Sequence, residues 1–178
     1  MDEKYECLAC PEGSASGAGT NGGCSQAPAG KYVFGSSELR DCDAGKYSSA
    51  GSTECTACEA GKYTSSTGTP DACTWTNAGY YPAVSSDDTT WALSAAQAQA
   101  PCSAGRYAEA AYEPTAADGD GCILVASDDF DIVVGANYGV YTTNSDGNDI
   151  FLGTDSGGIA KVPCPFGYYR VDKYICDK

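Results

Sequence analysis

Residues 42–73, CDAGKYSSAGSTECTACEAGKYTSSTGTPDAC, contain one short unit twice. Each copy begins with Cys-x-x-Gly-Lys-Tyr, continues through a loop of Ser, Thr and Gly, and ends at a further Cys. The two copies meet at Cys55-x-x-Cys58. Because a fixed repeat indicates that each copy is one small structural unit, the stretch predicts a fold assembled from short modules bounded by cysteines.

The same pattern extends beyond this stretch. The Cys-x-x-Gly spacing recurs at Cys10, Cys102 and Cys164, and Cys24 and Cys73 reach a Gly-x-Tyr sequence through a longer spacing. The glycine permits a positive φ, so the chain can turn sharply beside the sulfur. The tyrosine offers a flat apolar face that can cover a disulfide, with its hydroxyl at the water boundary.

The composition explains why such units need cross-links. Leu, Ile, Val and Phe together number 22 of 178 residues and the net charge is -14, a combination that by itself would predict disorder. The 11 cysteines supply the missing constraint and indicate an oxidising compartment. Sixteen of the 22 apolar residues lie in residues 122–178, so the first two thirds must rely on disulfides and the last third has a small core.

Sequential pairing within each loop accounts for ten of the cysteines. Each closed loop should contribute about 3 kcal/mol in the chain-entropy model. The sequence leaves an interleaved scheme open, in which Cys7 pairs with Cys24 and Cys10 with Cys42. The sequential pairs are Cys10–Cys24, Cys42–Cys55, Cys58–Cys73, Cys102–Cys122 and Cys164–Cys176.

Sequential pairing leaves Cys7 alone. In the pattern of the repeat, Cys7 closes a unit whose opening cysteine lies upstream. We therefore expect either further chain before Met1 or a bond from Cys7 to another subunit; the alternative is a buried, unpaired thiol.

The units Cys42-Asp-Ala-Gly-Lys-Tyr and Cys58-Glu-Ala-Gly-Lys-Tyr, joined through Cys55-Thr-Ala-Cys58, resemble ephrin-receptor-like cysteine-rich repeats. These repeats are related to tumour-necrosis-factor-receptor and EGF-like growth-factor modules. The resemblance covers mainly residues 7–73. It implies an extracellular, elongated ladder of disulfides in a surface or matrix protein, and it supplies no ligand because such modules serve many proteins.

The middle of the chain changes character. Asp87 or Asp88 can cap a helix that runs through Trp91, Ala95 and Ala98, and Pro101 would end it. We expect the face formed by Trp91, Ala95 and Ala98 to pack on a neighbouring module. A second short helix is expected at residues 108–112.

After Cys122 the sequence turns to short β-favouring runs separated by Asp, Asn and Gly turns. The runs are residues 123–125, 130–134, 140–143, 150–152 and 159–162. The predicted fold is therefore small, disulfide-rich, and mostly β or irregular. It has tandem repeats at 1–75, a divergent cysteine-rich module with a short helix at 76–121, and a small antiparallel β-sheet block at 122–178, closed by a last Cys-x-x-Gly-Tyr-Tyr unit.

The sequence argues against catalysis. Histidine is absent, which excludes Ser-His and Cys-His nucleophile pairs and any metal site that contains histidine. Zinc or a redox dithiol at Cys55-x-x-Cys58 is the alternative to structural disulfides there, and both need free thiolates.

Ten scattered basic residues argue against nucleic acid. No apolar run is long enough to span a membrane or, at residues 1–4, to act as a signal; we expect any targeting segment to lie outside this sequence.

Two groups of polar residues are candidate sites. Acidic residues crowd the turns near the predicted sheet and suggest calcium as the one cofactor, against the alternative of a merely solvated surface. These residues are Asp118, Asp120, Asp128, Asp129, Asp131, Asp146 and Asp149. Hydroxyls in one polar loop are candidates for O-linked glycan, against a merely flexible loop. These residues are Thr64, Ser65, Ser66, Thr67 and Thr69.

The sequence thus predicts a non-enzymatic, extracellular or cell-surface module of a coat, appendage or filament, which associates with identical or related subunits through module–module contacts. The alternative is a receptor-type or adhesive ectodomain that binds a protein ligand or glycan, with Trp75, Tyr80 and Trp91 in its binding patch.

Overall fold

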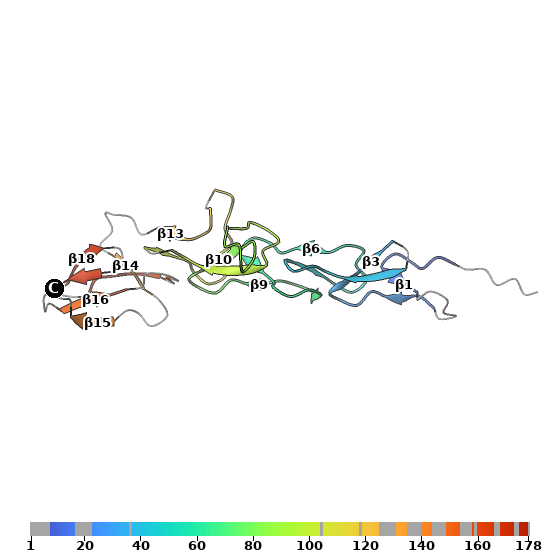
Figure 1. Ribbon diagram of the computed structural model, residues 1–178, viewed down its shortest axis with the longest axis horizontal. Helices are drawn as coiled ribbons and strands as arrows, with labels where there is room; N and C mark the ends of the chain where they lie inside the picture. Colours follow the sequence, from blue (N-terminus) through green and yellow to red (C-terminus); the bar gives the residue numbers. More distant parts are fainter. Residues whose placement is uncertain are drawn as a thin grey trace, which may run out of the picture. The chain divides into compact units, whose positions relative to one another are not determined.

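The structure of the protein is a computed structural model (Figure 1). It describes residues 8–16, 23–35, 37–103, 105–117, 119–124, 131–134, 140–143, 149–153, 158, 160–165, 168–172 and 175–177. These residues form short strands, turns and irregular segments, and none of them is helical. The predicted class, a disulfide-rich fold that is mostly β or irregular, is confirmed.

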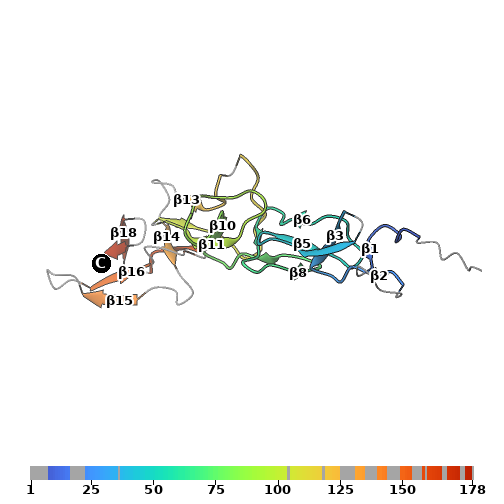
Figure 2. The same ribbon diagram turned by 45° about the vertical axis from the view of Figure 1, so that its right-hand side comes forward.

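The strands up to Cys73 are two to four residues long. β1 pairs with β2 and β3 with β4, both antiparallel, while β5 pairs antiparallel with β6 and parallel with β8 (Figure 2). The strands are β1 Ser14–Ala15, β2 Ser25–Gln26, β3 Lys31–Phe34, β4 Glu38–Asp41, β5 Lys46–Ser48, β6 Thr56–Ala57, β7 Lys62–Tyr63 and β8 Thr69–Pro70.

The later strands are likewise two to four residues long, and the pairings between them are all antiparallel. β7 pairs with β9, β10 with β11, β12 with β13 and β14 with β17, and a four-stranded sheet has the order β15-β16-β19-β18 (Figure 1). These strands are β9 Thr74–Trp75, β10 Tyr80–Ala83, β11 Ala98–Pro101, β12 Arg106–Tyr107, β13 Ile123–Leu124, β14 Asp131–Val134, β15 Val140–Thr143, β16 Asp149–Leu152, β17 Ala160–Pro163, β18 Tyr169–Asp172 and β19 Ile175–Asp177.

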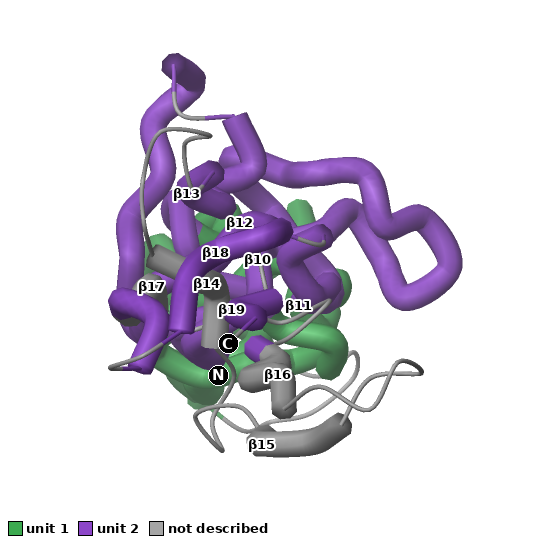
Figure 3. The backbone as a smooth tube through the Cα atoms, turned by 90° about the vertical axis from the view of Figure 1, so that its left-hand side faces the viewer, with its two compact units in different colours: residues 1–58, 64–73 green, residues 59–63, 74–178 purple. Residues whose placement is uncertain are grey.

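The chain divides into two compact units (Figure 3). Unit 1 comprises Met1–Cys58 and Thr64–Cys73, and unit 2 comprises Glu59–Tyr63 and Thr74–Lys178. The segments predicted at 76–121 and 122–178 both fall within unit 2.

The interior of the described part consists of sulfur and small side chains. The largest side chains that are fully buried there are Cys42, Cys58, Cys102, Cys176 and Ser48. Several alanines are buried beside them, and Val33 and Tyr107 are the larger apolar residues that join them. Disulfides therefore occupy the position that aliphatic side chains fill in an ordinary core.

The same tight turn recurs at the Cys-x-x-Gly sequences whose glycine the structure describes and at the longer variants. The N–H of the residue after the glycine donates to the carbonyl three residues earlier, as in Lys31 to Pro28, Lys46 to Asp43 and Lys62 to Glu59, each at 3.1 Å. The glycine at the third position of each turn has a positive φ, between +74° and +85°. This is the geometry of a type II turn, which requires glycine at that position. The glycines are Gly13, Gly30, Gly45, Gly61, Gly79 and Gly105.

A second backbone hydrogen bond joins the glycine of one turn to a cysteine further along the chain in the same unit. In unit 1 the carbonyl of Gly30 accepts from the N–H of Cys42, and the carbonyl of Gly45 accepts from the N–H of Cys58, both at 2.9 Å. In unit 2 the carbonyl of Gly79 accepts from Cys102 at 2.8 Å. In each case the donor is the residue directly before the next turn, and the hydrogen bond uses main-chain atoms alone.

The predicted helix at residues 87–100 is wrong. Asp88 does accept a backbone hydrogen bond, from Thr90, but the following chain folds back on β10, where Trp91 bridges Ala83 and Gln97 donates to Ala83. Residues 98–101 form β11. A short helix needs a core that buries its apolar face. The alanines instead fit the close approach of two strands, and Ala96 and Ala100 are buried there.

The second predicted helix, at residues 108–112, is wrong for a related reason. Ala108 donates its N–H to Gly158 and accepts at its carbonyl from Gly79, which leaves it part of a strand-like pairing. Ala111 has a φ of +55°, outside the right-handed helical region.

The strands after Cys122 follow the sequence prediction closely. Each of the five predicted runs overlaps a strand, from β13 to β17, but these strands belong to three separate sheets and not to one. The last cysteine unit, however, is not a separate closing element. It supplies β18 and β19, and β19 lies inside the four-stranded sheet next to β16, where Cys176 is fully buried.

Candidate functional site

Five disulfides cross-link the described cysteines, with Cα–Cα distances of 5.5 to 5.8 Å. They join the pairs of the sequential scheme: Cys10–Cys24, Cys42–Cys55, Cys58–Cys73, Cys102–Cys122 and Cys164–Cys176. Cys55 and Cys58 are bonded to different partners, so neither offers a thiolate for zinc or dithiol chemistry in this state. Cys7 lies outside the described residues.

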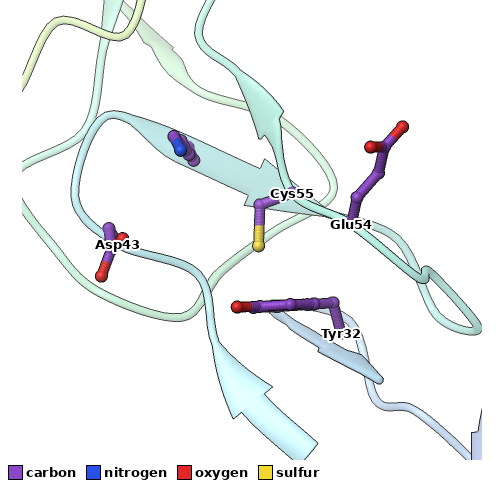
Figure 4. Close-up of a pocket in the computed structure, with 5 residues that line it drawn as sticks. Tyr32, Asp43, Glu54 and Cys55 are labelled. Carbon is purple, nitrogen blue, oxygen red and sulfur yellow. The ribbon is translucent and has the colours of Figure 1, made fainter. Parts of the chain in front are cut away.

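After two of the turns, the tyrosine that follows the glycine lies against the cysteines of the next loop. The sulfur of Cys55 points towards the ring face of Tyr32, which follows Gly30 (Figure 4). In unit 2, Tyr81 packs against the buried cluster of Cys102, Cys122 and Ala108. The sequence predicts a tyrosine over sulfur, and the structure adds that the sulfur belongs to the following loop.

Four of the turn glycines are followed by a basic residue. Three of these four basic residues have an acidic partner. Lys31 pairs with Asp41, Lys62 with Glu59 at 3.4 Å, and Arg106 with Asp120 at 3.3 Å. The fourth, Lys46, has no ion pair among the residues that the structure describes.

Lys46 instead lines an open recess of about 260 Å³ on unit 1. Tyr32, Asp43, Glu54 and Cys55 complete its lining. In Figure 4 the Tyr32 ring forms one wall beneath the Cys55 sulfur, and its hydroxyl end points towards Asp43. The sequence did not predict this site. The only signal is that Asp43 stands where the next copy of the repeat has Glu59.

The β3–β4 hairpin carries a second cluster on its exposed face. The Arg40 guanidinium lies 3.6 Å from the centroid of the Phe34 ring, and Tyr32 meets Phe34 edge to face at 6.5 Å between centroids. Arg40 also donates two hydrogen bonds to the Glu38 carboxylate, at 2.9 and 3.0 Å. These hydrogen bonds lower the pKa of Glu38 below its usual value and raise that of Arg40.

Apolar side chains are exposed on both units. Of the three aromatic residues predicted for a binding patch, Trp75 and Tyr80 are 37% and 36% exposed, whereas Trp91 is half-buried and its indole N–H has no partner among the described residues. Lys62 lies over the Trp75 ring at 4.8 Å. Tyr169 and Val171 are exposed on β18, which lies at one edge of the four-stranded sheet.

The calcium hypothesis stays a prediction. Among the predicted ligands only Asp120 has a described side chain. Its carboxylate accepts from Arg106 and from the backbone N–H of Cys122 at 3.0 Å, which is a structural role. Asp131 and Asp149 begin β14 and β16, while Asp118, Asp128, Asp129 and Asp146 lie outside the described residues. The described residues contain no group of three or more possible metal ligands.

The hydroxyl groups of the candidate glycan loop differ in their exposure to solvent. Thr64 is buried and shares a hydrogen bond of 2.7 Å with Thr69, whose hydroxyl also donates to the carbonyl of Ser66. Ser65, Ser66 and Thr67 are exposed. The accessible candidates for O-linked glycan are therefore these three, because modification of Thr64 would require the loop to open.

Within the described part of the chain there is no helix with the length and apolar character that a membrane crossing needs. Comparison with protein families and with curated proteins finds no match to this chain.

Proposed function

We propose that the protein is an extracellular, non-catalytic structural module of a surface coat, appendage or filament, and that it associates with further copies of itself. The observation that carries this proposal is the interior made of disulfides and small residues. Such an interior is stable only where thiols stay oxidised, which favours an extracellular location.

The finer proposal is that each Gly turn with its loop is one module and that the modules follow in tandem. It is supported by the recurring turn hydrogen bonds and by the main-chain bond that joins one turn to the next. The placement of Tyr32 and Tyr81 against the cysteines of the following loop supports the same interpretation. A module defined in this way needs no aliphatic core of its own.

A sheet edge is the proposed surface for contact with another copy. β18 lies at the edge of its sheet, and Tyr169 and Val171 on it are 59% and 50% exposed. Edge strands with exposed apolar residues are templates for pairing with another strand, and proteins that must stay monomeric block them with lysine or proline. Strand addition at this edge would bury both side chains.

The experiment is to purify the native, oxidised protein and to follow its assembly by electron microscopy and sedimentation. Regular fibres or sheets are expected, and V171K should reduce assembly strongly because it places a charge in the proposed contact. T67K, at an exposed loop position of unit 1, is the matched control and should assemble as the wild type does. A dispersed monomer at all concentrations would contradict the proposal.

An adhesive ectodomain is the second candidate, favoured by the exposure of Trp75 and Tyr80. Exposed aromatic residues often dominate the binding energy of a protein interface. If the wild type remains monomeric, W75A should reduce adhesion of protein-coated beads to cells at a temperature where thermal melting shows that the variant is still folded.

A further inference from the structure

Two turn glycines of unit 1 pack directly on the backbone of a later loop. A Cβ on Gly13 would overlap the carbonyl group of Gly51, and a Cβ on Gly30 would overlap that of Gly68. In each case the loop follows the second turn after the glycine in question. Only glycine permits such an approach, in which a Cα–H group faces a carbonyl oxygen. The chain therefore uses one packing contact at least twice.

Unit 2 contains the same contact. A Cβ on Gly61 would overlap the carbonyl group of Tyr112, in the loop after the turn at Gly105. This loop again follows the second turn after the glycine, since the turn at Gly79 lies between them. The spacing of the contact is thus a property of the repeat and not of one pair of residues.

A third loop glycine, Gly35, belongs to the same class as Gly51 and Gly68. Each of the three lies five to seven residues after a turn glycine and is followed by Ser or Thr. Each also has a positive φ, which is +67° at Gly35, +78° at Gly51 and +68° at Gly68. By sequence and by backbone conformation, the tip of the β3–β4 hairpin resembles the two loops that receive a turn glycine.

Gly35 is open where the other two loop glycines are covered. A Cβ on Gly51 would meet the amide of Gln26, and a Cβ on Gly68 would lie 3.1 Å from the carboxylate of Asp41. A Cβ on Gly35 would meet nothing within 4 Å. The part of the chain that the structure describes therefore leaves this loop without the packing that the other two have.

The hydrogen bonds of the three loops show the same difference. The N–H of Gly51 donates to the carbonyl of Ala27 at 2.8 Å, and the N–H of Gly68 donates to the carbonyl of Cys42 at 2.7 Å. Both acceptors directly precede a turn. Among the described residues, no corresponding hydrogen bond comes from Gly35.

We infer that the tip of the β3–β4 hairpin, formed by Gly35 with Phe34 and Leu39, is a docking surface for the last cysteine unit of a second copy of this chain. The inference rests on the proposed structural function and names the contact through which copies associate. Phe34 and Leu39 are 47% and 40% exposed, so docking would remove apolar surface from water. Repeat proteins that stay soluble as monomers close such a surface with a terminal repeat that has a polar outer face.

The last cysteine unit has the features that this occupant needs. The N–H of Tyr168 donates to the carbonyl of Pro165 at 2.9 Å, which is the hydrogen bond that closes the other turns. The chain then enters β18 and β19, so no loop among the described residues lies two turns beyond it. Tyr169 and Val171 on β18 are 59% and 50% exposed. Because the contact joins two different surfaces, each pair of copies keeps one of each free, and further copies can add.

The test is assembly of G35F in the intact, oxidised protein, followed by sedimentation and electron microscopy. The phenyl group would fill the open space at the hairpin tip, so the protein concentration needed for assembly should rise about tenfold or more. G119F is the matched control, because Gly119 also has a positive φ, +66°, and a Cβ there would meet nothing within 4 Å. It should assemble as the wild type does, and thermal melting shows that both variants are folded at the assay temperature.

A mixing experiment identifies the occupant. G35F blocks the hairpin tip, and V171K places a charge on the last cysteine unit, so each variant alone should sediment as a monomer. An equimolar mixture should form pairs, because each variant supplies the surface that the other lacks. The pairs should not grow further, since their two remaining surfaces are both blocked.

The outcomes separate this inference from the proposed function. Equal assembly of wild type and G35F would overturn the inference and leave self-association standing through another surface, such as a contact between two β18 edges. An equal loss of assembly in G119F, or a mixture that forms no pairs, would also overturn the inference. A wild type that stays monomeric at all concentrations would overturn the inference and the proposed function together.

Discussion

Two regions of the molecule are stabilised in different ways. One comprises the residues up to Cys73, and the other is the four-stranded sheet of β15, β16, β18 and β19. The first region has strands of two to four residues, and its largest fully buried side chains are those of Cys42, Cys58 and Ser48. In the second region three or four residues of each strand take part in antiparallel pairing, with a register shift in β18 and one disulfide attached to β19. Disulfides therefore supply most of the interior where apolar residues are scarce, and strand pairing contributes more in the sheet.

The largest effect should come from reduction of the disulfides. Three of them close loops within residues 8–73, and at about 3 kcal/mol each they contribute about 9 kcal/mol, comparable to the whole stability of a typical domain. Reduced protein should therefore lose amide protection throughout this region. The sheet should keep more protection at β16 and β19, which hydrogen-deuterium exchange with mass spectrometry would measure. Equal loss in both regions would contradict the comparison.

The next largest effect should come from a substitution at the close backbone approach of Gly30 and Gly68 in the first region. Gly30 has a φ of +85°, and a Cβ there would overlap the carbonyl group of Gly68. G30A should therefore destabilise unit 1 by about 3 kcal/mol, the sum of a left-handed backbone penalty and overpacking. Denaturant unfolding of oxidised protein would measure it.

Gly35 is the matched control in the same hairpin. Its φ is also positive, at +67°, but a Cβ would meet nothing within 4 Å. G35A should cost only the backbone penalty, about 1 kcal/mol. If both variants unfold at the same denaturant concentration, the packing of Gly30 on Gly68 does not contribute.

A smaller effect is expected from the polar interior. The buried hydroxyl of Thr64 shares a hydrogen bond with Thr69, so T64V should destabilise the loop by about 1 kcal/mol through a lost hydrogen bond. T67V, at an exposed position of the same loop, should be nearly neutral. A double-mutant cycle of T64V with T69V would show whether the two hydroxyls act as a pair.

The smallest effect concerns pH. Hydrogen bonds from Arg40 lower the pKa of Glu38 below 4.5, so its ionised form is favoured in the folded state. The stabilising contribution is present above the unfolded pKa and is lost as the pH falls through the lowered, folded value. The melting temperatures of wild type and E38Q should therefore differ slightly at neutral pH and converge in strongly acidic solution. Added salt should shrink the difference, because the pair is exposed.

Much of the fold could be predicted because the signals are local. A glycine three residues after a cysteine gives a tight turn whatever surrounds it, and the β-favouring runs after Cys122 gave five strands. The helix at 87–100 failed because small alanines suit both a helix and closely approaching strands. Only the pairing partner, Tyr80–Ala83, decides between them. The place of β19 between β16 and β18 also depends on long-range pairing.

The candidate sites were harder to predict. The recess joins Tyr32, Asp43 and Glu54 from different turns, and no spacing in the sequence brings them together. The hairpin cluster likewise depends on register, which sets Tyr32 opposite Arg40 and Phe34 opposite Glu38. Only the shorter acid at Asp43 could have drawn attention to the recess, and its meaning requires the Glu59–Lys62 pair for comparison.

The main-chain hydrogen bonds that join Gly30 to Cys42 and Gly45 to Cys58 have a consequence for evolution. Because carbonyl and amide groups make it, most outward-facing side chains can be exchanged without disturbing the scaffold. Such a chain is free to diversify its surface rapidly, and the positions under strict selection reduce to the half-cystines and the turn glycines.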